Sequence, residues 1–330
     1  MRGRTMKGKF VTHEQVFTWM ERERGLVVIT ERAQKKYHHL LPSHLITVKT
    51  AKELFFSPWE AVYRYTLQGK TWVIEEKVEH SSFPSFLVLL PCEAKAILEV
   101  TDVNFMTEDT PDLGYARRRR GVTLIIVGCE RIEQTCFCSL VGCSPFWRHR
   151  ESVFLFPWKG HFYLEDGEEK LSLSPFEDPQ KAQAVETFFA ETICTLPLPL
   201  PANFPEKLYA HFDDPLWQKM AWHCVNCGAC TYLCPTCYCF DLSVDGKLRG
   251  LTLHTWDSCM FPKFTLHASS HNPRPTGKER VRQRVMHKFS YFPLRNKYYG
   301  CVGCGVCREI CPVNWDIKEV VEGMVRQVER

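Results

Sequence analysis

The chain has 330 residues, of which 45% are hydrophobic and 24% charged, with a formal net charge of +4 at pH 7. This is the composition of an ordinary globular protein with room for two domains, and its charge is too small to indicate nucleic-acid binding. No run of 18 apolar residues is present to span a membrane, and the basic N-terminus leads into no apolar segment of a signal peptide. We therefore expect a reducing cytoplasm, in which the 17 cysteines serve metal rather than disulfides.

The N-terminal half predicts mixed α and β structure, beginning with an amphipathic helix at 13–24 and a strand at 26–30. Residues 86–90 and 122–127 are short apolar runs, typical of strands buried on both faces of a parallel sheet. Helices expected at 93–100 and 112–120 supply the crossover that parallel strands need.

A cysteine follows each of these two strands, Cys92 after the first and Cys129 after the second. If the strands are neighbours, both thiols lie at the carboxyl edge of the sheet, where α/β folds place their ligands. Cys136 and Cys138 follow a few residues later, and four thiols are what a 4Fe-4S cubane requires. The sequence thus predicts a third cluster site, with buried apolar cysteines as the alternative.

The chain then predicts antiparallel strands at 152–156 and 161–165 and a helix at 179–193. Residues 196–201 carry a proline at every second position, which favours a stiff, extended connector. We therefore predict an α+β fold in three parts: an N-terminal α/β domain at 1–195, a proline-rich linker at 196–206, and a mainly helical, ferredoxin-like domain at 207–330. Cys143 and Cys194 are interpreted as ordinary apolar residues.

The C-terminal part contains the pattern C-x2-C-x2-C-x3-C-P twice. This is the signature of two 4Fe-4S clusters in which the fourth cysteine of each run ligates the other cluster. The predicted ligands are Cys224, Cys227, Cys230 and Cys311 for one cluster, and Cys301, Cys304, Cys307 and Cys234 for its neighbour. Zinc is the alternative metal, but a zinc site needs only two cysteines per arm and does not explain four followed by proline.

Between the motifs lies an insert with three more cysteines, Cys237, Cys239 and Cys259. They are interpreted either as packing around the clusters or as ligands of a further site whose fourth member the sequence does not name. The insert also predicts a helix at 278–289, whose charged residues we expect mostly in solvent, although a basic face beside clusters would raise their potentials. A last helix is expected at 317–328.

Several short runs accompany the motifs in a fixed order: C-P-T-C-x-C at 234–239, W-D-S-C at 256–259 and H-N-x-R at 271–274. Together they resemble an iron-sulfur protein family found in soluble sulfhydrogenases, as the β subunit of cytoplasmic NiFe hydrogenases, and in anaerobic sulfite reductase. The resemblance extends more weakly to Cys92 and to the C-F-C at 136–138, where the family also has cysteines. The chain departs from the family at Glu93, where Asp is usual, and at Ser269 and Ser270, where glycines are usual.

The resemblance implies an anaerobic electron-transfer subunit that passes single electrons between a flavoprotein using NAD(P)H and a catalytic subunit carrying NiFe or siroheme. No G-x-G-x-x-G after a strand, phosphate loop or nucleophile-base pair indicates catalysis by the chain itself. Three alternatives remain open: an adaptor for a heterodisulfide-reductase-like or formate-oxidising complex, a redox enzyme that binds flavin in its N-terminal domain, and a zinc-stabilised interaction protein.

Overall fold

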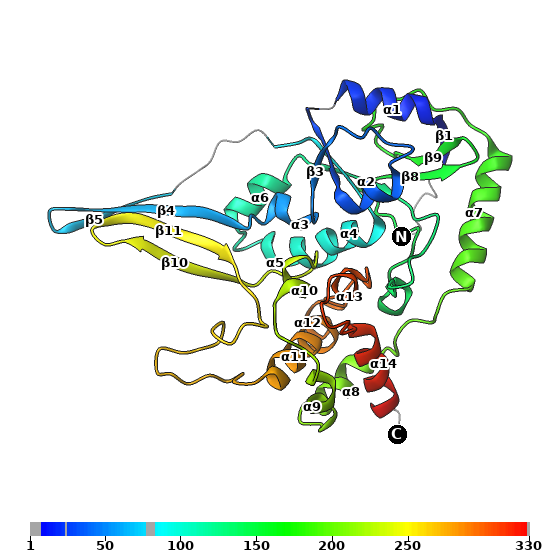
Figure 1. The fold of residues 1–330 in the computed structure, drawn as a ribbon. Helices are drawn as coiled ribbons and strands as arrows, with labels where there is room; N and C mark the ends of the chain where they lie inside the picture. The colour runs from blue at the N-terminus through cyan, green and yellow to red at the C-terminus, as the bar shows by residue number, and fades with distance from the viewer. Residues whose placement is uncertain (1–7, 24, 77–82, 329–330) are drawn as a thin grey trace.

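The computed structural model describes residues 8–23, 25–76 and 83–328. Its N-terminal part is built on a seven-stranded sheet in the order β1-β9-β8-β7-β6-β2-β3 (Figure 1). The strands are β1 (Lys9–Thr12), β2 (Val27–Thr30), β3 (Ile46–Val48), β6 (Phe86–Leu89), β7 (Thr123–Val127), β8 (Val153–Trp158) and β9 (His161–Glu165). The predicted parallel pairing of β6 with β7 and the antiparallel pairing of β8 with β9 are both confirmed.

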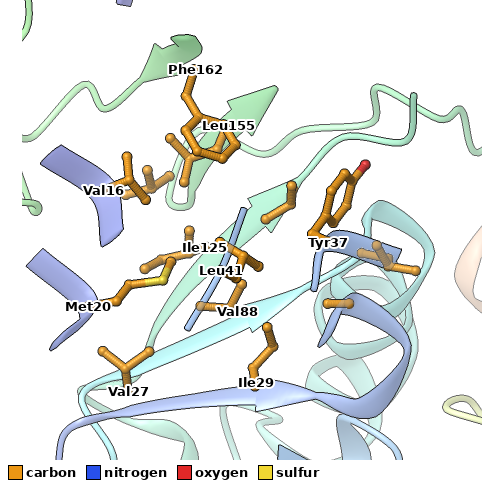
Figure 2. Close-up of a cluster of buried hydrophobic side chains, with 14 of the residues drawn as sticks. Val16, Met20, Val27, Ile29, Tyr37, Leu41, Val88, Ile125, Leu155 and Phe162 are labelled. Atoms are coloured by element: carbon orange, nitrogen blue, oxygen red, sulfur yellow. The ribbon is translucent and has the colours of Figure 1, made fainter. Parts of the chain in front are cut away.

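Helices cover both faces of this sheet, which explains its continuous apolar strands. The helices are α1 (His13–Arg22), α2 (Glu31–Tyr37), α3 (Lys52–Phe55), α4 (Pro91–Ala96), α5 (Asp102–Phe105), α6 (Leu113–Arg119) and α7 (Pro179–Cys194), with a π-helical turn at Ile97–Thr101. α1 and α2 pack on one face through residues such as Met20 and Tyr37 (Figure 2). α3, α4, α6 and α7 pack on the other face, where Tyr115 and Phe189 are buried.

The order of the parallel strands reverses between β2 and β6. From β2 the chain continues to β3 on one side, and it then returns to β6 and proceeds through β7 and β8 on the other side. In open α/β sheets, ligands bind at the carboxyl ends of the two strands that flank such a reversal. Arg32 follows β2 and Cys92 follows β6, so both lie at this position.

A second sheet of four antiparallel strands projects as a long blade from the rest of the molecule (Figure 1). Its order is β10-β11-β4-β5, with β4 (Trp59–Gln68), β5 (Thr71–Glu76), β10 (Phe240–Gly246) and β11 (Arg249–Trp256). β10 and β11 form a hairpin inside the insert between the two cysteine motifs, and β11 pairs with β4 of the N-terminal part. The insert therefore ties the cysteine motifs to the N-terminal half, a contact that the sequence analysis did not predict.

The C-terminal part is otherwise helical, as expected. Its helices are α8 (Phe204–Ala210), α9 (Leu216–Ala221), α10 (Ala229–Tyr232), α11 (Gly277–Met286), α12 (Phe292–Asn296), α13 (Val306–Glu309) and α14 (Ile317–Val328), with a π-helical turn at His287–Tyr291. The extended connector ends at Phe204, where α8 begins. Pro205 is tolerated in the first turn of this helix, because N-H groups there have no partner within the helix. Within the described ranges, no helix combines the length and the apolar character needed to cross a membrane.

Candidate iron-sulfur sites

The twelve cysteines predicted as cluster ligands form three sets. Site I contains Cys224, Cys227, Cys230 and Cys311; site II contains Cys234, Cys301, Cys304 and Cys307; site III contains Cys92, Cys129, Cys136 and Cys138. All four cysteines of site II line one small cavity, and all four of site III line one large cleft. The residues predicted to share a cluster are thus brought together in sites II and III, while their ligation remains a prediction.

Site I depends on contact between the two motif loops. Burial raises the pKa of the Cys224 thiol, and the neighbouring thiol of Cys311, from the other motif, raises it further. α10 contains Cys230, the third cysteine of one motif, and α13 contains Cys307, the third cysteine of the other, and these two helices contact each other. Cys230 also faces Cys307 of site II. The two motif loops therefore pack as the crossed arrangement requires.

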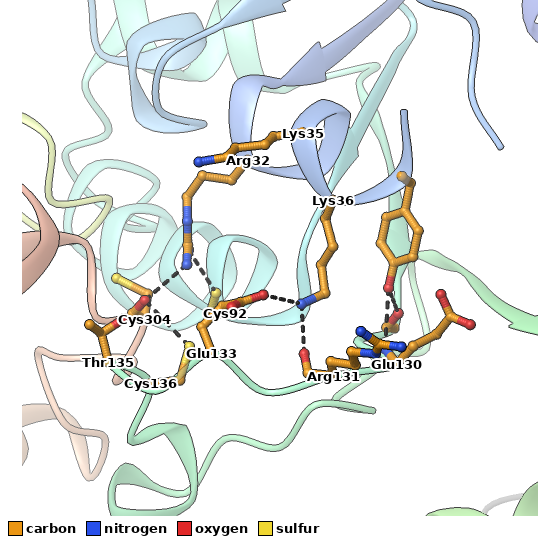
Figure 3. Close-up of polar contacts among 12 residues, drawn as sticks. Arg32, Lys35, Lys36, Cys92, Glu130, Arg131, Glu133, Thr135, Cys136 and Cys304 are labelled. Atoms are coloured by element: carbon orange, nitrogen blue, oxygen red, sulfur yellow. Dashed lines mark hydrogen bonds and ion pairs between the residues drawn. The ribbon is translucent and has the colours of Figure 1, made fainter. Parts of the chain in front are cut away.

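Site III opens into a cleft of about 960 Å³ at the carboxyl edge of the parallel strands. The Arg32 guanidinium donates to the Cys92 sulfur at 3.5 Å (Figure 3). Lys36, one turn further along α2, donates to the backbone carbonyl of Arg131 at 2.6 Å and to Glu133 at 3.1 Å. Positive side chains of α2 therefore hold the loop that carries the later cysteines of the site.

Sites II and III touch directly. Arg32 also donates to the carbonyl of Cys304 at 2.9 Å, and the Cys136 thiol donates to the same oxygen at 3.7 Å (Figure 3). The N-H of Phe137 donates to the carbonyl of Gly303 at 2.8 Å. Backbone of one site is therefore in hydrogen-bond contact with backbone and thiols of the other.

This contact requires glycine at position 303. Gly303 has φ +64°, and a Cβ there would lie 2.6 Å from the Cα of Cys138. Gly303→Ala is expected to destabilise the protein by about 1–2 kcal/mol through its left-handed backbone and by about 1–3 kcal/mol more through overpacking. A fall in thermal midpoint and in retained iron would show this in anaerobically purified protein.

Gly69→Ala is the matched control for this substitution, since Gly69 has φ +62° and nothing within 4 Å of the added Cβ. Gly69→Ala should therefore lose only the stability that a left-handed backbone costs an alanine, about 1–2 kcal/mol. Equal effects of the two substitutions would contradict the close approach of sites II and III.

Three charged side chains on α11 and the π-helical turn after it are buried, contrary to the sequence prediction. The charges of residues 278–289 were expected mostly in solvent, but Arg280, Arg284 and Lys288 are 8%, 3% and 4% exposed. Lys288 Nζ lies 3.5 Å from the Cys234 sulfur, and Arg284 lines the cavity of site II. These cations are separated by four residues each and share a face with Val281 and Val285, so helical periodicity was the signal that could have placed them inside.

Burial raises the pKa of several of these cysteine thiols. It raises the pKa of Cys92 and of Cys301 to about 12, and that of Cys138 to about 11, because a thiolate is poorly solvated inside the protein. Burial alone would lower the pKa of Lys288, but the neighbouring thiols of Cys234 and Cys237 outweigh it and raise that pKa. A metal that replaces the thiol protons would turn these sites into anions, which the buried cations would then stabilise.

Arg284 provides a test of whether site II fits such an anion. Its Nε and Nη1 atoms are buried and have no hydrogen-bond partner among the residues that the structure describes. Buried N-H groups of a guanidinium are costly when unsatisfied. A cluster held by the four thiols of the same cavity would present acceptor sulfurs to them, so the residues present fit an anionic iron-sulfur cluster.

The remaining cysteines behave differently from one another. Cys237, Cys239 and Cys259 are partly buried next to site II, Cys143 is buried near site III, and Cys194 is exposed at the end of α7. Within the described part of the chain, no three His, Cys, Asp or Glu side chains are arranged to hold a single metal ion. Sequence reasoning missed the roles of Arg32 and of Lys52, whose Nζ donates to the carbonyls of Thr231 and Cys237.

Comparison with known proteins agrees with these sites. Residues 223–315 match the family model described as a 4Fe-4S dicluster domain, so the chain is an iron-sulfur electron-transfer protein with two such clusters. It is 26% identical over 306 residues to Sulfhydrogenase 2 subunit beta of Pyrococcus furiosus, which covers 84% of this chain and 85% of that relative. The resemblance to the iron-sulfur β subunits is thereby confirmed. No solved structure matches the chain.

Proposed function

We propose that this protein is the electron-transfer subunit of a multi-subunit oxidoreductase and that it carries three 4Fe-4S clusters. Clusters I, II and III would be held by the cysteines of the sites with the same numbers. Each cubane accepts one electron at a time, and its potential is set by burial, charge and hydrogen bonds to sulfur. The chain would thus position and tune its clusters, with the substrate chemistry left to its partners.

The contact between sites II and III carries this proposal. Arg32 bonds to Cys92 of one site and to Cys304 of the other, while Cys230 of site I faces Cys307 of site II. Site II therefore lies between the other two, and electrons would pass along the order III, II, I or the reverse. The division into an N-terminal domain at 1–195, a linker at 196–206 and a dicluster domain at 207–330 is part of the same proposal, with cluster III in the first of these.

The partners follow from the relative rather than from the chain itself. Because that relative is a sulfhydrogenase subunit, we infer one partner that exchanges electrons with NAD(P)H through a flavin and another that carries the catalytic centre. A NiFe centre is favoured over siroheme by the name of the relative. An adaptor role in a heterodisulfide-reductase-like or formate-oxidising complex would use the same relay with other partners.

The cleft of site III favours one second candidate function. Its volume of about 960 Å³ and its position at the strand reversal suit a bound organic cofactor such as a flavin. Lys35, Lys36 and Lys159 would supply positive charge for phosphate groups. In that case the chain would be a redox enzyme in its own right.

Elemental analysis of the protein, purified anaerobically from its native host with any co-purifying subunits, tests the proposal. Three cubanes require at least about twelve irons and as many sulfides per chain. Bound flavin on the isolated chain would favour the second candidate, and zinc without sulfide would exclude the electron-transfer role.

Cys92→Ala tests cluster III separately. It should lower the iron content by about four atoms, the content of one cubane, and leave the rest in place. Cys194→Ala, which replaces an exposed thiol, should leave the iron content unchanged. The same iron content in both variants would count against a cluster in site III.

A further inference from the structure

Three cysteines outside sites I, II and III converge at the base of the β10–β11 hairpin. Cys237 and Cys239 directly precede β10, and Cys259 follows β11. The N-H of Asp257 donates to the carbonyl of Cys239 at 2.9 Å, which holds the two ends of the hairpin together. The hairpin thus brings side chains from both of its ends to one place beside the first cysteine motif.

The thiols of this group lie in two close pairs. The N-H of Cys237 donates to the carbonyl of Cys234 at 3.3 Å, so these two cysteines share one turn, and the thiols of Cys239 and Cys259 are neighbours across the base of the hairpin. Cys237 also faces Cys259, so the two pairs are neighbours. Cys234 is therefore the fourth thiol of the group, which the sequence alone did not identify.

Positive charge is concentrated around these four thiols. Lys52 and Lys288, 3% and 4% exposed, both face Cys237 and Cys239, and Arg284, 3% exposed, faces Cys259. Lys52 comes from α3 of the N-terminal part, and its Nζ lies 4.0 Å from the ring centroid of Trp256. None of the three cations forms an ion pair with a carboxylate in the described part of the chain.

Buried cations are stable when an anion faces them. The hydrogen-bond acceptors of Lys52 are the neutral carbonyls of Thr231 and Cys237, so they supply no negative charge. Metal binding converts all four thiols to thiolates and so supplies negative charge directly beside the cations. Cluster II would account for the charge at Cys234 but not at the other three cysteines.

We propose that Cys237, Cys239 and Cys259 ligate a further 4Fe-4S cluster and that Cys234 completes its ligand set by bridging it to cluster II. The assignment rests on the proposed function, because Cys234 is also a proposed ligand of cluster II. A thiolate sulfur has enough lone pairs to bind two irons. The three additional thiols release their protons to solvent when they bind, and the ligation itself requires no oxidation or reduction.

Iron and acid-labile sulfide in four forms of the anaerobically purified complex test the inference. The forms are the wild type, Cys92→Ala, Cys239→Ala and the double variant. With the further cluster and cluster III both present, each single variant should contain about four irons fewer than the wild-type complex, and the double variant about eight fewer. Cys194→Ala is the control and should match the wild type.

The same measurement separates failure of this inference from failure of the proposed cluster III. No loss in Cys239→Ala together with a loss of about four irons in Cys92→Ala would overturn the further cluster while leaving cluster III in place. No loss in Cys92→Ala together with a loss of about four irons in Cys239→Ala would support the further cluster and remove cluster III.

Cys259→Ala guards against a folding defect specific to position 239, because Cys259 lies at the other end of the hairpin. It should lose the same amount of iron as Cys239→Ala. Full iron in Cys259→Ala would overturn the proposal.

Discussion

Cys311→Ala is expected to remove the cluster held by the distant Cys224 loop and to spare the cluster of its own motif. Cys311 follows Cys307 by four residues, yet its thiol lies beside Cys224 in the structure. The N-H of Trp315 donates to the Cys311 sulfur at 3.2 Å, which keeps the thiol oriented. We expect a loss of about four irons, the content of one cubane.

Double variants identify which cluster is lost, since residues that act on one cluster should not have additive effects. Cys311→Ala combined with Cys224→Ala should lose no more iron than either single variant. Cys311→Ala combined with Cys301→Ala should lose about eight irons, because two cubanes are then affected. The crossed ligation is wrong if the double variant with Cys301→Ala loses no more iron than a single variant, while the double variant with Cys224→Ala loses about eight irons.

The cysteine motifs could be predicted from sequence because their spacing already implies a tertiary contact. A loop with three closely spaced cysteines reaches one cluster, and its fourth cysteine is useful only if the other loop packs against it. Site III could be predicted for a related reason. Two apolar strands, each followed by a cysteine, define one edge of a parallel sheet, and the structure pairs these strands as neighbours.

The cations could not be predicted in the same way, because their partners are distant in sequence. Lys52 reaches the carbonyl of Cys237, 185 residues away, and the pairing of β4 with β11 helps to bring the two segments together. The spacing of Arg284 and Lys288 on a helix face shared with Val281 and Val285 could have indicated burial, but their charge favoured the surface. Their burial makes physical sense only beside anions, and sequence spacing does not show where those anions lie.

Arg284→Met is expected to lower the reduction potentials of clusters I and II. Arg284 faces Cys230 of site I and Cys307 of site II, and it is 3% exposed. A positive charge stabilises the reduced, more negative cluster, so removing it favours the oxidised form. Unit charges about 8 Å apart interact by about 2 kcal/mol at an effective dielectric constant of about 20. For one electron this corresponds to about 90 mV, since about 59 mV is a tenfold change.

Arg282→Met is the matched control because Arg282 lies on the same helix but points away from the thiols. Its guanidinium pairs with Asp213 at 3.3 Å and stacks 3.7 Å from the ring centroid of Phe212. Redox titration followed by electron paramagnetic resonance should show lowered potentials in Arg284→Met only, with iron content unchanged in both variants. Equal potentials in the two variants would mean that the buried guanidinium does not act on the clusters. A selective shift would show that α11 supplies the charge that makes clusters I and II easier to reduce.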